Sequence, residues 1–251
     1  MNDTALSASR SETAARTGEA LARAKDVEKT FVTGKLEVPA LRGLSLEVRG
    51  GDFLALVGPS GSGKTTLLNL VGALDRPTRG EVEVLGQKLS TLGKGERARL
   101  RLEKLGFVFQ AYNLVPVLTA AENVEFVLEL QGASARERRA RALEVLTDLG
   151  LGDLAHRRPN ELSGGQQQRV SVARAIASRP KIVLADEPTA NLDTQSAEQL
   201  MALMERLHRE HGTTFLFSTH DPRIVAHATR VVTLVDGRIE SDETRKAAEA
   251  P

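Results

Sequence analysis

A glycine-rich segment containing one lysine and one threonine has the composition of a phosphate-binding loop. Residues 58–65 read GPSGSGKT and satisfy the pattern G-x-x-x-x-G-K-[ST] between an expected strand and an expected helix. Such glycines let backbone N–H groups surround phosphate oxygens, and the helix N-terminus adds positive potential. Lys64 is expected to reach the β- and γ-phosphates, and Thr65 to ligate Mg²⁺. The candidate nucleotide-binding residues are Gly58, Pro59, Ser60, Gly61, Ser62, Gly63, Lys64, Thr65 and Thr66.

Two acids follow a second apolar run, residues 181–186 (KIVLAD). In an open parallel sheet, ligands bind at the carboxyl ends of the strands, so Asp186 and Glu187 are expected to face the same phosphates. Asp186 suits a water-mediated contact with Mg²⁺, and Glu187 suits a base that orients the attacking water. Together with the loop, these acids predict a nucleoside triphosphatase.

A second glycine-containing segment, residues 160–176 (NELSGGQQQRVSVARAI), begins like a helix. Ser163 and Gln166 have the spacing of a capping box. The cap does not require Gly164 and Gly165, each of which costs about 1 kcal/mol relative to Ala in a helix. We therefore expect another group to approach the backbone of Gly164 and Gly165 closely. The serine hydroxyl and the bare helix N-terminus at Gly165 form a candidate anion site.

Three further residues are weak candidates when taken alone. Gln110 ends the short apolar segment GFVFQ, and His220 ends the segment TTFLFSTH. Phe31, which precedes the phosphate-binding loop, could stack on a base. Each is equally consistent with a purely structural role.

The elements that position these residues alternate between strands and helices. Residues 53–57 (FLALV) are continuously apolar, as in a strand covered on both faces, whereas residues 44–48 (LSLEV) alternate like a half-buried strand. Residues 111–160 indicate helices without strands, beginning with a capping box at Thr119 and Glu122. Residues 230–240 read as a hairpin that turns at Asp236-Gly237. The expected fold is α/β, with a mainly parallel P-loop core, an antiparallel β subdomain and an inserted helical subdomain at about residues 111–165.

Composition narrows the remaining possibilities. The 251 residues contain 34 Lys and Arg against 33 Asp and Glu, so there is no global field to hold nucleic acid. The chain has no Cys, which excludes disulfides and thiolate metal sites, and no apolar run approaches the roughly 20 residues of a membrane span. We expect a disordered tail at residues 1–24, a single ATPase domain at 25–241 and a frayed end at 242–251.

The order of these motifs resembles that of ATP-binding cassette (ABC) ATPases. GPSGSGKT, the strand-ending Gln110, LSGGQQQR, LADEP, Asp193 and His220 follow one another as in that family, and the resemblance covers residues 27–240. It implies that Gln110 senses Mg²⁺ and the attacking water, that His220 contacts the γ-phosphate, and that Asp193 lies at a dimer seam. Phe31 stands where these ATPases usually have a Tyr stacked on adenine.

The same resemblance implies a homodimer that sandwiches two ATP molecules. Ser163, Gly164, Gly165 and Gln166 of one copy would then clasp the γ-phosphate held by the other copy's P-loop. Several segments, including NLVPVLTAAENV and LADEPTANLD, are most similar to the lipoprotein-releasing and macrolide-exporting branch. Its members drive an integral membrane permease with a large extracytoplasmic domain, often beside a periplasmic adaptor, from the cytoplasmic face of the inner membrane. Residues 111–160 are expected to dock the permease, with Leu114 and Val115 beside Tyr112 as contacts.

Two alternatives remain open from the sequence. Polar amino-acid importers share much of the NLVPVLTAAENV motif, so the direction of transport is open. ATPases of DNA repair and chromosome organisation also pair a P-loop with an LSGGQ-like segment, but they place long coiled coils between the two. Only about a hundred residues separate Gly63 from Ser163 here, without sustained heptads, so no nucleic acid partner is expected.

Overall fold

The computed structural model describes residues 18–34 and 36–245. Of the expected tails at residues 1–24 and 242–251, residues 1–17 and 246–251 therefore lie outside the described residues. The strands are β1 (Ala20–Thr33), β2 (Leu36–Arg49), β3 (Phe53–Val57), β4 (Arg79–Val84), β5 (Gln87–Lys88), β6 (Leu105–Val108), β7 (Ile182–Asp186), β8 (Thr214–Ser218), β9 (Arg230–Val235) and β10 (Arg238–Thr244). The α-helices are α1 (Lys64–Val71), α2 (Lys94–Lys104), α3 (Ala120–Leu130), α4 (Ala135–Asp148), α5 (Gly164–Ala177), α6 (Thr194–His211) and α7 (Pro222–Val225). Short 3₁₀ helices span Gly152–Leu154 and Pro159–Glu161.

The central sheet is mainly parallel, as predicted, with the strand order β10-β9-β3-β8-β7-β6 in the described part of the chain. Strand β3 is continuously apolar because both of its faces are buried. Phe53 and Ala55 contribute to the core on one face of the sheet, which α3, α4, α5 and α6 cover. Leu54 and Leu56 contribute to the core on the other face, under α1 and the second sheet. The two faces bury alternate side chains of the same strand.

The second sheet is antiparallel, with the order β2-β1-β4-β5. Strand β1 begins at Ala20, inside the segment predicted to be a tail, so that boundary was placed too late. Ala22 pairs with Val48 on one side and Val84 on the other, and the alanine is buried. Pairing on both edges fixes a segment whose composition carries little strand propensity. Similarly, β10 continues to Thr244, beyond the expected start of the frayed end.

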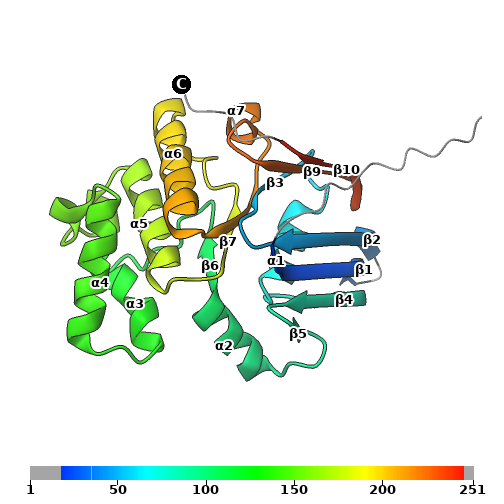
Figure 1. Cartoon of the computed structure of the whole chain (residues 1–251), viewed down its shortest axis with the longest axis horizontal. Coiled ribbons are helices and arrows are strands. Elements are labelled where there is room, and N and C mark those ends of the chain that lie inside the picture. The colour runs from blue at the N-terminus through cyan, green and yellow to red at the C-terminus, as the bar shows by residue number, and fades with distance from the viewer. Residues whose placement is uncertain (1–17, 35, 246–251) are drawn as a thin grey trace, which may run out of the picture.

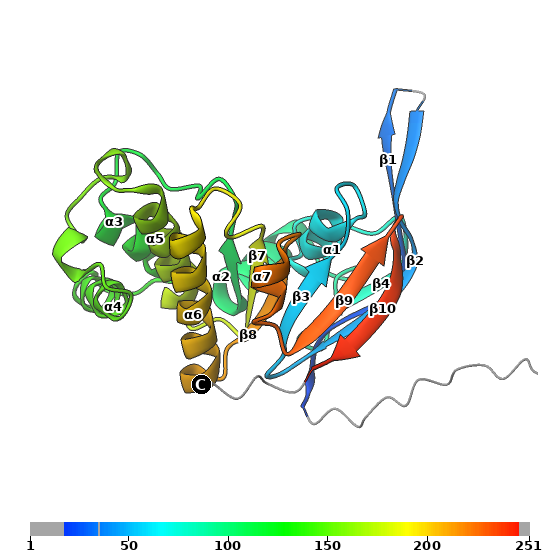
Figure 2. The ribbon, with the colours of Figure 1, turned by 90° about the horizontal axis from the view of Figure 1, so that it is seen from above.

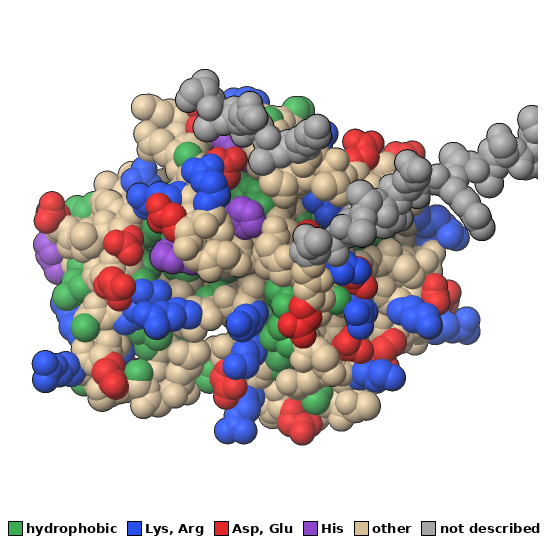
Figure 3. Space-filling model, viewed as in Figure 1, with side chains coloured by type: hydrophobic (Ala, Val, Ile, Leu, Met, Phe, Trp, Pro, Cys, Tyr) green, Lys and Arg blue, Asp and Glu red, His purple; other side chains and the backbone are tan. Residues whose placement is uncertain are grey.

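The helical part lies at one side of the molecule and the antiparallel sheet at the other (Figure 1). From above, the β1–β2 hairpin projects beyond the body (Figure 2). The predicted capping box at α3 is confirmed, because Glu122 N donates to Thr119 Oγ1 while Thr119 N donates to Glu122 Oε2. Basic and acidic side chains are interspersed over the face shown in Figure 3, and no helix within residues 18–34 and 36–245 is long and apolar enough to cross a bilayer.

Candidate functional site

The glycine-rich loop connects β3 to α1 in a conformation that side chains would obstruct. A Cβ at Gly58 would lie 2.0 Å from the carbonyl oxygen of Leu234, and one at Gly63 would lie 2.7 Å from that of Ala40. Both glycines also have positive φ, 144° and 105°. The buried Lys64 donates from Nζ to the carbonyl oxygens of Gly58, at 2.7 Å, and Pro59, at 3.0 Å. The lysine is thus held across the loop, where a third N–H donor can serve a phosphate.

Thr65 and Asp186 meet beside this loop. The threonine hydroxyl donates to Asp186 Oδ1 at 3.1 Å, although 121 residues separate the two in sequence. Hydroxyl and carboxylate oxygens suit Mg²⁺, which usually takes one or two protein ligands and fills its octahedron with phosphate oxygens and water. Within the described ranges, no group of three or more His, Cys, Asp and Glu side chains could hold a metal by itself. The Thr65 hydroxyl and the Asp186 carboxylate, beside a phosphate-binding loop, fit a cation whose other ligands are phosphate oxygens and water.

Sequence reasoning missed Ser218, which connects the two acids. This fully buried residue ends β8, next to β7. Its hydroxyl donates to Asp186 Oδ1 at 2.6 Å and accepts a hydrogen bond from Glu187 N at 2.9 Å. The sequence did carry a signal for Ser218, because it is a polar residue at the end of an otherwise apolar strand. Ser218 consequently orients the Asp186 carboxylate and holds the backbone of Glu187.

A cavity of about 710 Å³ brings most of the predicted residues together. Glu187 and His220 meet there at hydrogen-bond distance, from the ends of β7 and β8. Gln110 lies two residues beyond the end of β6, and its backbone carbonyl accepts from Asn191 Nδ2 at 2.9 Å. The lining residues are Val38, Pro39, Ala40, Ser60, Gly61, Ser62, Gly63, Lys64, Thr65, Thr66, Gln110, Glu187, Ala190 and His220.

Phe31 sits on β1 at the edge of this arrangement. It pairs across the hairpin with Val38, which lines the cavity, and its side chain is 44% exposed. The Lys29 ammonium lies 5.0 Å from the ring centroid and also forms an ion pair with Asp75 at 2.8 Å. The exposed ring is available for stacking, and Lys29, two residues earlier on β1, lies over the ring.

The LSGGQ segment does not line this cavity. The capping box predicted from sequence is formed: Ser163 Oγ accepts from Gln166 N, and Gln166 Oε1 accepts from Ser163 N. A Cβ at Gly164 would lie 3.0 Å from the Tyr112 hydroxyl, and one at Gly165 would lie 3.1 Å from Ser196 Oγ. The sequence suggested that Gly164 and Gly165 make room for a ligand. Close packing within the chain accounts for part of the need for glycine at these positions.

Asp193 caps α6 beside the LSGGQ segment. Its carboxylate accepts from the hydroxyl and the backbone N–H of Ser196, and these hydrogen bonds lower the pKa of Asp193. Since Ser196 also lies against Gly165, the aspartate is connected to the start of α5 through one residue. The chain thus carries two separate groups of candidate residues, the cavity and the LSGGQ–Asp193 surface.

Comparisons with known proteins agree with this arrangement. A family model described as ABC transporter matches residues 41–190, more than half of the chain. An ABC transporter ATP-binding protein of Thermotoga maritima is 51% identical over 220 residues, which cover 88% of this chain and 94% of that protein. The lipoprotein-releasing system ATP-binding protein LolD of Anaeromyxobacter dehalogenans is 49% identical over 217 residues, covering 86% of this chain and 91% of LolD.

A longer relative and a solved structure add to these matches. The macrolide export ATP-binding/permease protein MacB 2 of Aeromonas hydrophila is 47% identical over 93% of this chain, which spans only 36% of that protein. The dimeric structure of the ATP-binding cassette MJ0796 in a post-hydrolysis state, bound to ADP and Pi, has a TM-score of 0.84 and 43% identity. The alignment covers 90% of this chain and all of that one.

Proposed function

Because the chain belongs to the ABC transporter family, as an ATP hydrolase of the lipoprotein-releasing and macrolide-exporting branch, we propose that two copies of it enclose two ATP molecules and drive a membrane permease. One observation carries this proposal. The cavity unites the P-loop with Gln110, Glu187 and His220, whereas Ser163 lies outside it with a hydroxyl able to donate to an anion. A second copy, placed so that its LSGGQ segment faces the P-loop of the first, would supply the missing half of each site. The dimeric MJ0796 cassette supports such an assembly.

The roles proposed for individual residues follow from their positions. Lys64 and the backbone N–H groups of the loop hold the β- and γ-phosphates of ATP, and Phe31 stacks on the adenine. Thr65 and Gln110 ligate Mg²⁺, and Asp186 holds it through water. When bound, the cation neutralises phosphate charge.

Hydrolysis itself requires a water directed at the γ-phosphate. Glu187 lines the cavity as a half-buried carboxylate and accepts a proton from, or orients, that water. His220 contacts the γ-phosphate. Across the dimer seam, Ser163, the glycines after it and Gln166 contact the partner's γ-phosphate, while Asp193 lies at the seam beside them.

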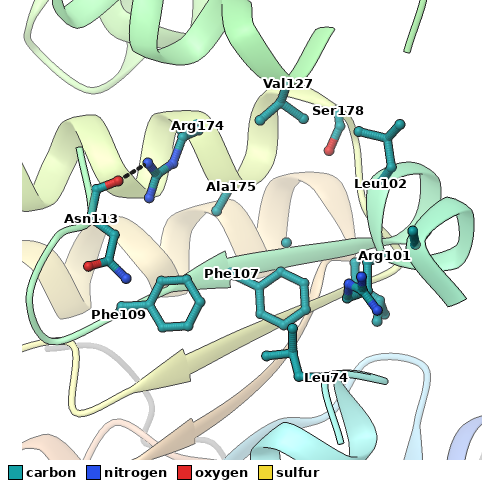
Figure 4. Close-up of a pocket in the computed structure, with 13 residues that line it drawn as sticks. Leu74, Arg101, Leu102, Phe107, Phe109, Asn113, Val127, Arg174, Ala175 and Ser178 are labelled. Atoms are coloured by element: carbon teal, nitrogen blue, oxygen red, sulfur yellow. Dashed lines mark hydrogen bonds between the residues drawn. The ribbon is translucent and has the colours of Figure 1, made fainter. Parts of the chain in front are cut away.

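A groove beside the nucleotide cavity is the proposed permease dock. A cavity of about 420 Å³ lies between α2, α3 and α5, and the molecule is hollowed there in Figure 3. Phe107, Phe109, Leu102 and Val127 supply an apolar lining (Figure 4). Arg174, whose pKa burial lowers, donates to the carbonyl oxygens of Tyr112 and Asn113 just after Gln110. An apolar helix seated in the groove would therefore press on the segment that enters the nucleotide cavity.

This groove changes which residues are expected to touch the permease. Leu114 packs against the protein core. The backbone N–H of Val115 donates to Asn123 Oδ1, and the backbone carbonyl of Val115 accepts from Asn123 Nδ2. Both residues anchor the segment, so the contacts expected from sequence at Leu114 and Val115 move to the groove lining. The helical subdomain inserted within the 25–241 ATPase domain serves as one wall of that groove.

The relatives suggest what the partner is. LolD is named as the ATP-binding protein of a lipoprotein-releasing system, and MacB joins ATP-binding and permease parts in one protein. By analogy, this chain works at the cytoplasmic face of the inner membrane with a permease that has a large extracytoplasmic domain and a periplasmic adaptor. The transported material would be a lipoprotein, a lipid or a macrolide.

The Glu187→Gln variant tests the ATP-enclosing dimer. The amide keeps the size of the side chain but cannot act as a base, so ATP binds without being hydrolysed. Light scattering of the variant with ATP should give the mass of two chains, and with ADP the mass of one. Lys64→Ala in the same background is the control, because it removes the cation that holds the phosphates. A Glu187→Gln chain that binds ATP and stays monomeric contradicts the proposal.

A further inference from the structure

The backbone at Glu187 is held in a conformation that this residue type rarely adopts. Its φ is 46°, in the left-handed region that favours glycine. Such a conformation persists only where the surroundings fix it, and strained residues concentrate at functional sites. The contacts on either side of Glu187 therefore determine where its carboxylate lies.

Two fully buried side chains from different elements form hydrogen bonds with the backbone of Glu187 and Pro188. Ser218 accepts from Glu187 N at 2.9 Å, and Gln168 donates from Nε2 to the carbonyl oxygen of Pro188 at 2.6 Å. Ser218 belongs to the neighbouring strand of the same sheet. Gln168 instead belongs to α5, whose first residue, Gly164, follows the capping Ser163. A single side chain thus connects the LSGGQ helix to the peptide that carries the hydrolytic carboxylate.

Core packing alone does not explain a glutamine at position 168. Its Oε1 is buried, and no hydrogen-bond partner for it exists among the described residues. A buried polar atom without a partner destabilises the fold, whereas an apolar side chain of the same length would fill the space without that cost. The hydrogen bond that the amide does make, from Nε2 to the Pro188 carbonyl oxygen, therefore gives its function.

We propose that Gln168 is a positioning residue that couples the LSGGQ helix to Glu187 of the same chain. This inference rests on the proposed function, in which α5 of each copy contacts the ATP bound by the other. A displacement of α5 on meeting that ATP moves the Pro188 carbonyl and, through the strained peptide, the Glu187 carboxylate. Occupancy of one ATP site consequently sets the hydrolytic geometry of the other.

The Gln168→Met variant tests the coupling in the homodimer. Methionine keeps the length of the side chain but cannot donate to Pro188. We expect kcat to fall roughly tenfold to a hundredfold, as for a misplaced catalytic group. The Hill coefficient for ATP should approach 1, while ATP affinity of the isolated chain and the Tm are retained. Gln167→Met is the matched control, because Gln167 donates to Leu162 within its own segment, at 3.0 Å.

Several outcomes contradict the proposal in this first experiment. An unchanged kcat and Hill coefficient would show that the hydrogen bond has no part in coupling. A variant that fails to fold, or that loses Tm and ATP affinity together, would mark the amide as structural. Equal effects of Gln167→Met and Gln168→Met would assign the loss to α5 as a whole rather than to Pro188.

A dimer with one working site shows through which residue Gln168 acts. One chain carries Lys64→Ala and the other Ser163→Arg, and the mixed dimer is isolated through two tags. The intact site then uses Glu187 of the Ser163→Arg chain and the LSGGQ helix of the Lys64→Ala chain. Gln168→Met should lower activity when placed on the Ser163→Arg chain and have little effect on the other. The reverse pattern overturns the inference. A single-site dimer that is inactive, while the pairing with both lesions on one chain is active, refutes the shared sites themselves.

Discussion

The imidazole Nδ1 of His220 lies 3.1 Å from each carboxylate oxygen of Glu187. The two residues follow the adjacent strands β7 and β8, so the parallel pairing of those strands brings together side chains 33 residues apart in sequence. His220 is largely exposed and Glu187 largely covered, with side-chain exposures of 69% and 19%. The shared contact orients the carboxylate, and Nε2 is the ring nitrogen that takes no part in it.

Removing this imidazole should impair hydrolysis more than ATP binding. In His220→Ala the carboxylate loses its partner and the γ-phosphate loses its proposed contact with the ring, so kcat should fall about a hundredfold. ATP affinity should change little, because Lys64 and the loop remain. The matched control is His227→Ala, which removes a second His–Glu contact, with Glu205 at 2.9 Å, away from the cavity. Similar losses of kcat in both variants would contradict the role of His220.

The cavity residues were predictable from sequence to the extent that their signals are local. The P-loop, the acids after β7 and both capping boxes each lie within one short segment, where spacing alone specifies the backbone. Ser218 and Gln168 were not predictable in this way. Each contacts the Asp186–Pro188 segment from a different element, and that contact exists only after the chain has folded.

The start of β1 was mispredicted, and the residues proposed for the permease dock differ from those expected from sequence, for a related physical reason. Ala20 and Ala22 have low strand propensity. Pairing with β2, and for Ala22 also with β4, places them in the sheet. Leu114 and Val115 looked like contacts because they are apolar. Leu114 instead packs against the core, and the backbone of Val115 is hydrogen-bonded to the side chain of Asn123. Hydrophobicity pointed to a segment for permease contact but did not indicate which of its side chains are exposed to a partner.

A charge in the groove should separate permease binding from basal hydrolysis. Val127 lines the groove on α3, and Val127→Asp would place an uncompensated carboxylate against the docked helix. The Kd for the permease should rise about a hundredfold, equivalent to a loss near 3 kcal/mol. Co-purification should be lost while ATP turnover of the isolated chain persists.

The control for the groove is a second exposed apolar residue outside it. Val117 is 71% exposed and does not line the groove, so Val117→Asp should leave co-purification intact. If Val127→Asp instead retains the permease and abolishes hydrolysis, α3 supports the fold of the nucleotide site rather than the dock.

Arg230 is predicted to stabilise the fold without serving the nucleotide. It is 2% exposed at the start of β9, and it donates to Asp52, Asp242 and the backbone carbonyl of Glu47. Arg230→Met leaves partly buried carboxylates without their cation, which should lower the free energy of unfolding by about 3–5 kcal/mol. Urea denaturation measures the loss, and the exposed Arg238→Met on the same hairpin is the control. Changes of equal size in both variants would contradict a role for burial.

The last prediction concerns which chain's LSGGQ segment serves each ATP. With Lys64→Ala on one chain and Ser163→Arg on the other, shared sites leave one site with both lesions and the other intact. Roughly half of the wild-type hydrolysis should remain, or less where the sites cooperate. With both lesions on one chain paired with wild type, each site inherits one lesion, so activity should be close to nil. If each chain used its own Ser163, the second pairing would be active and the first inactive. That result would leave the crowding by Tyr112 and Ser196 as the whole reason for Gly164 and Gly165.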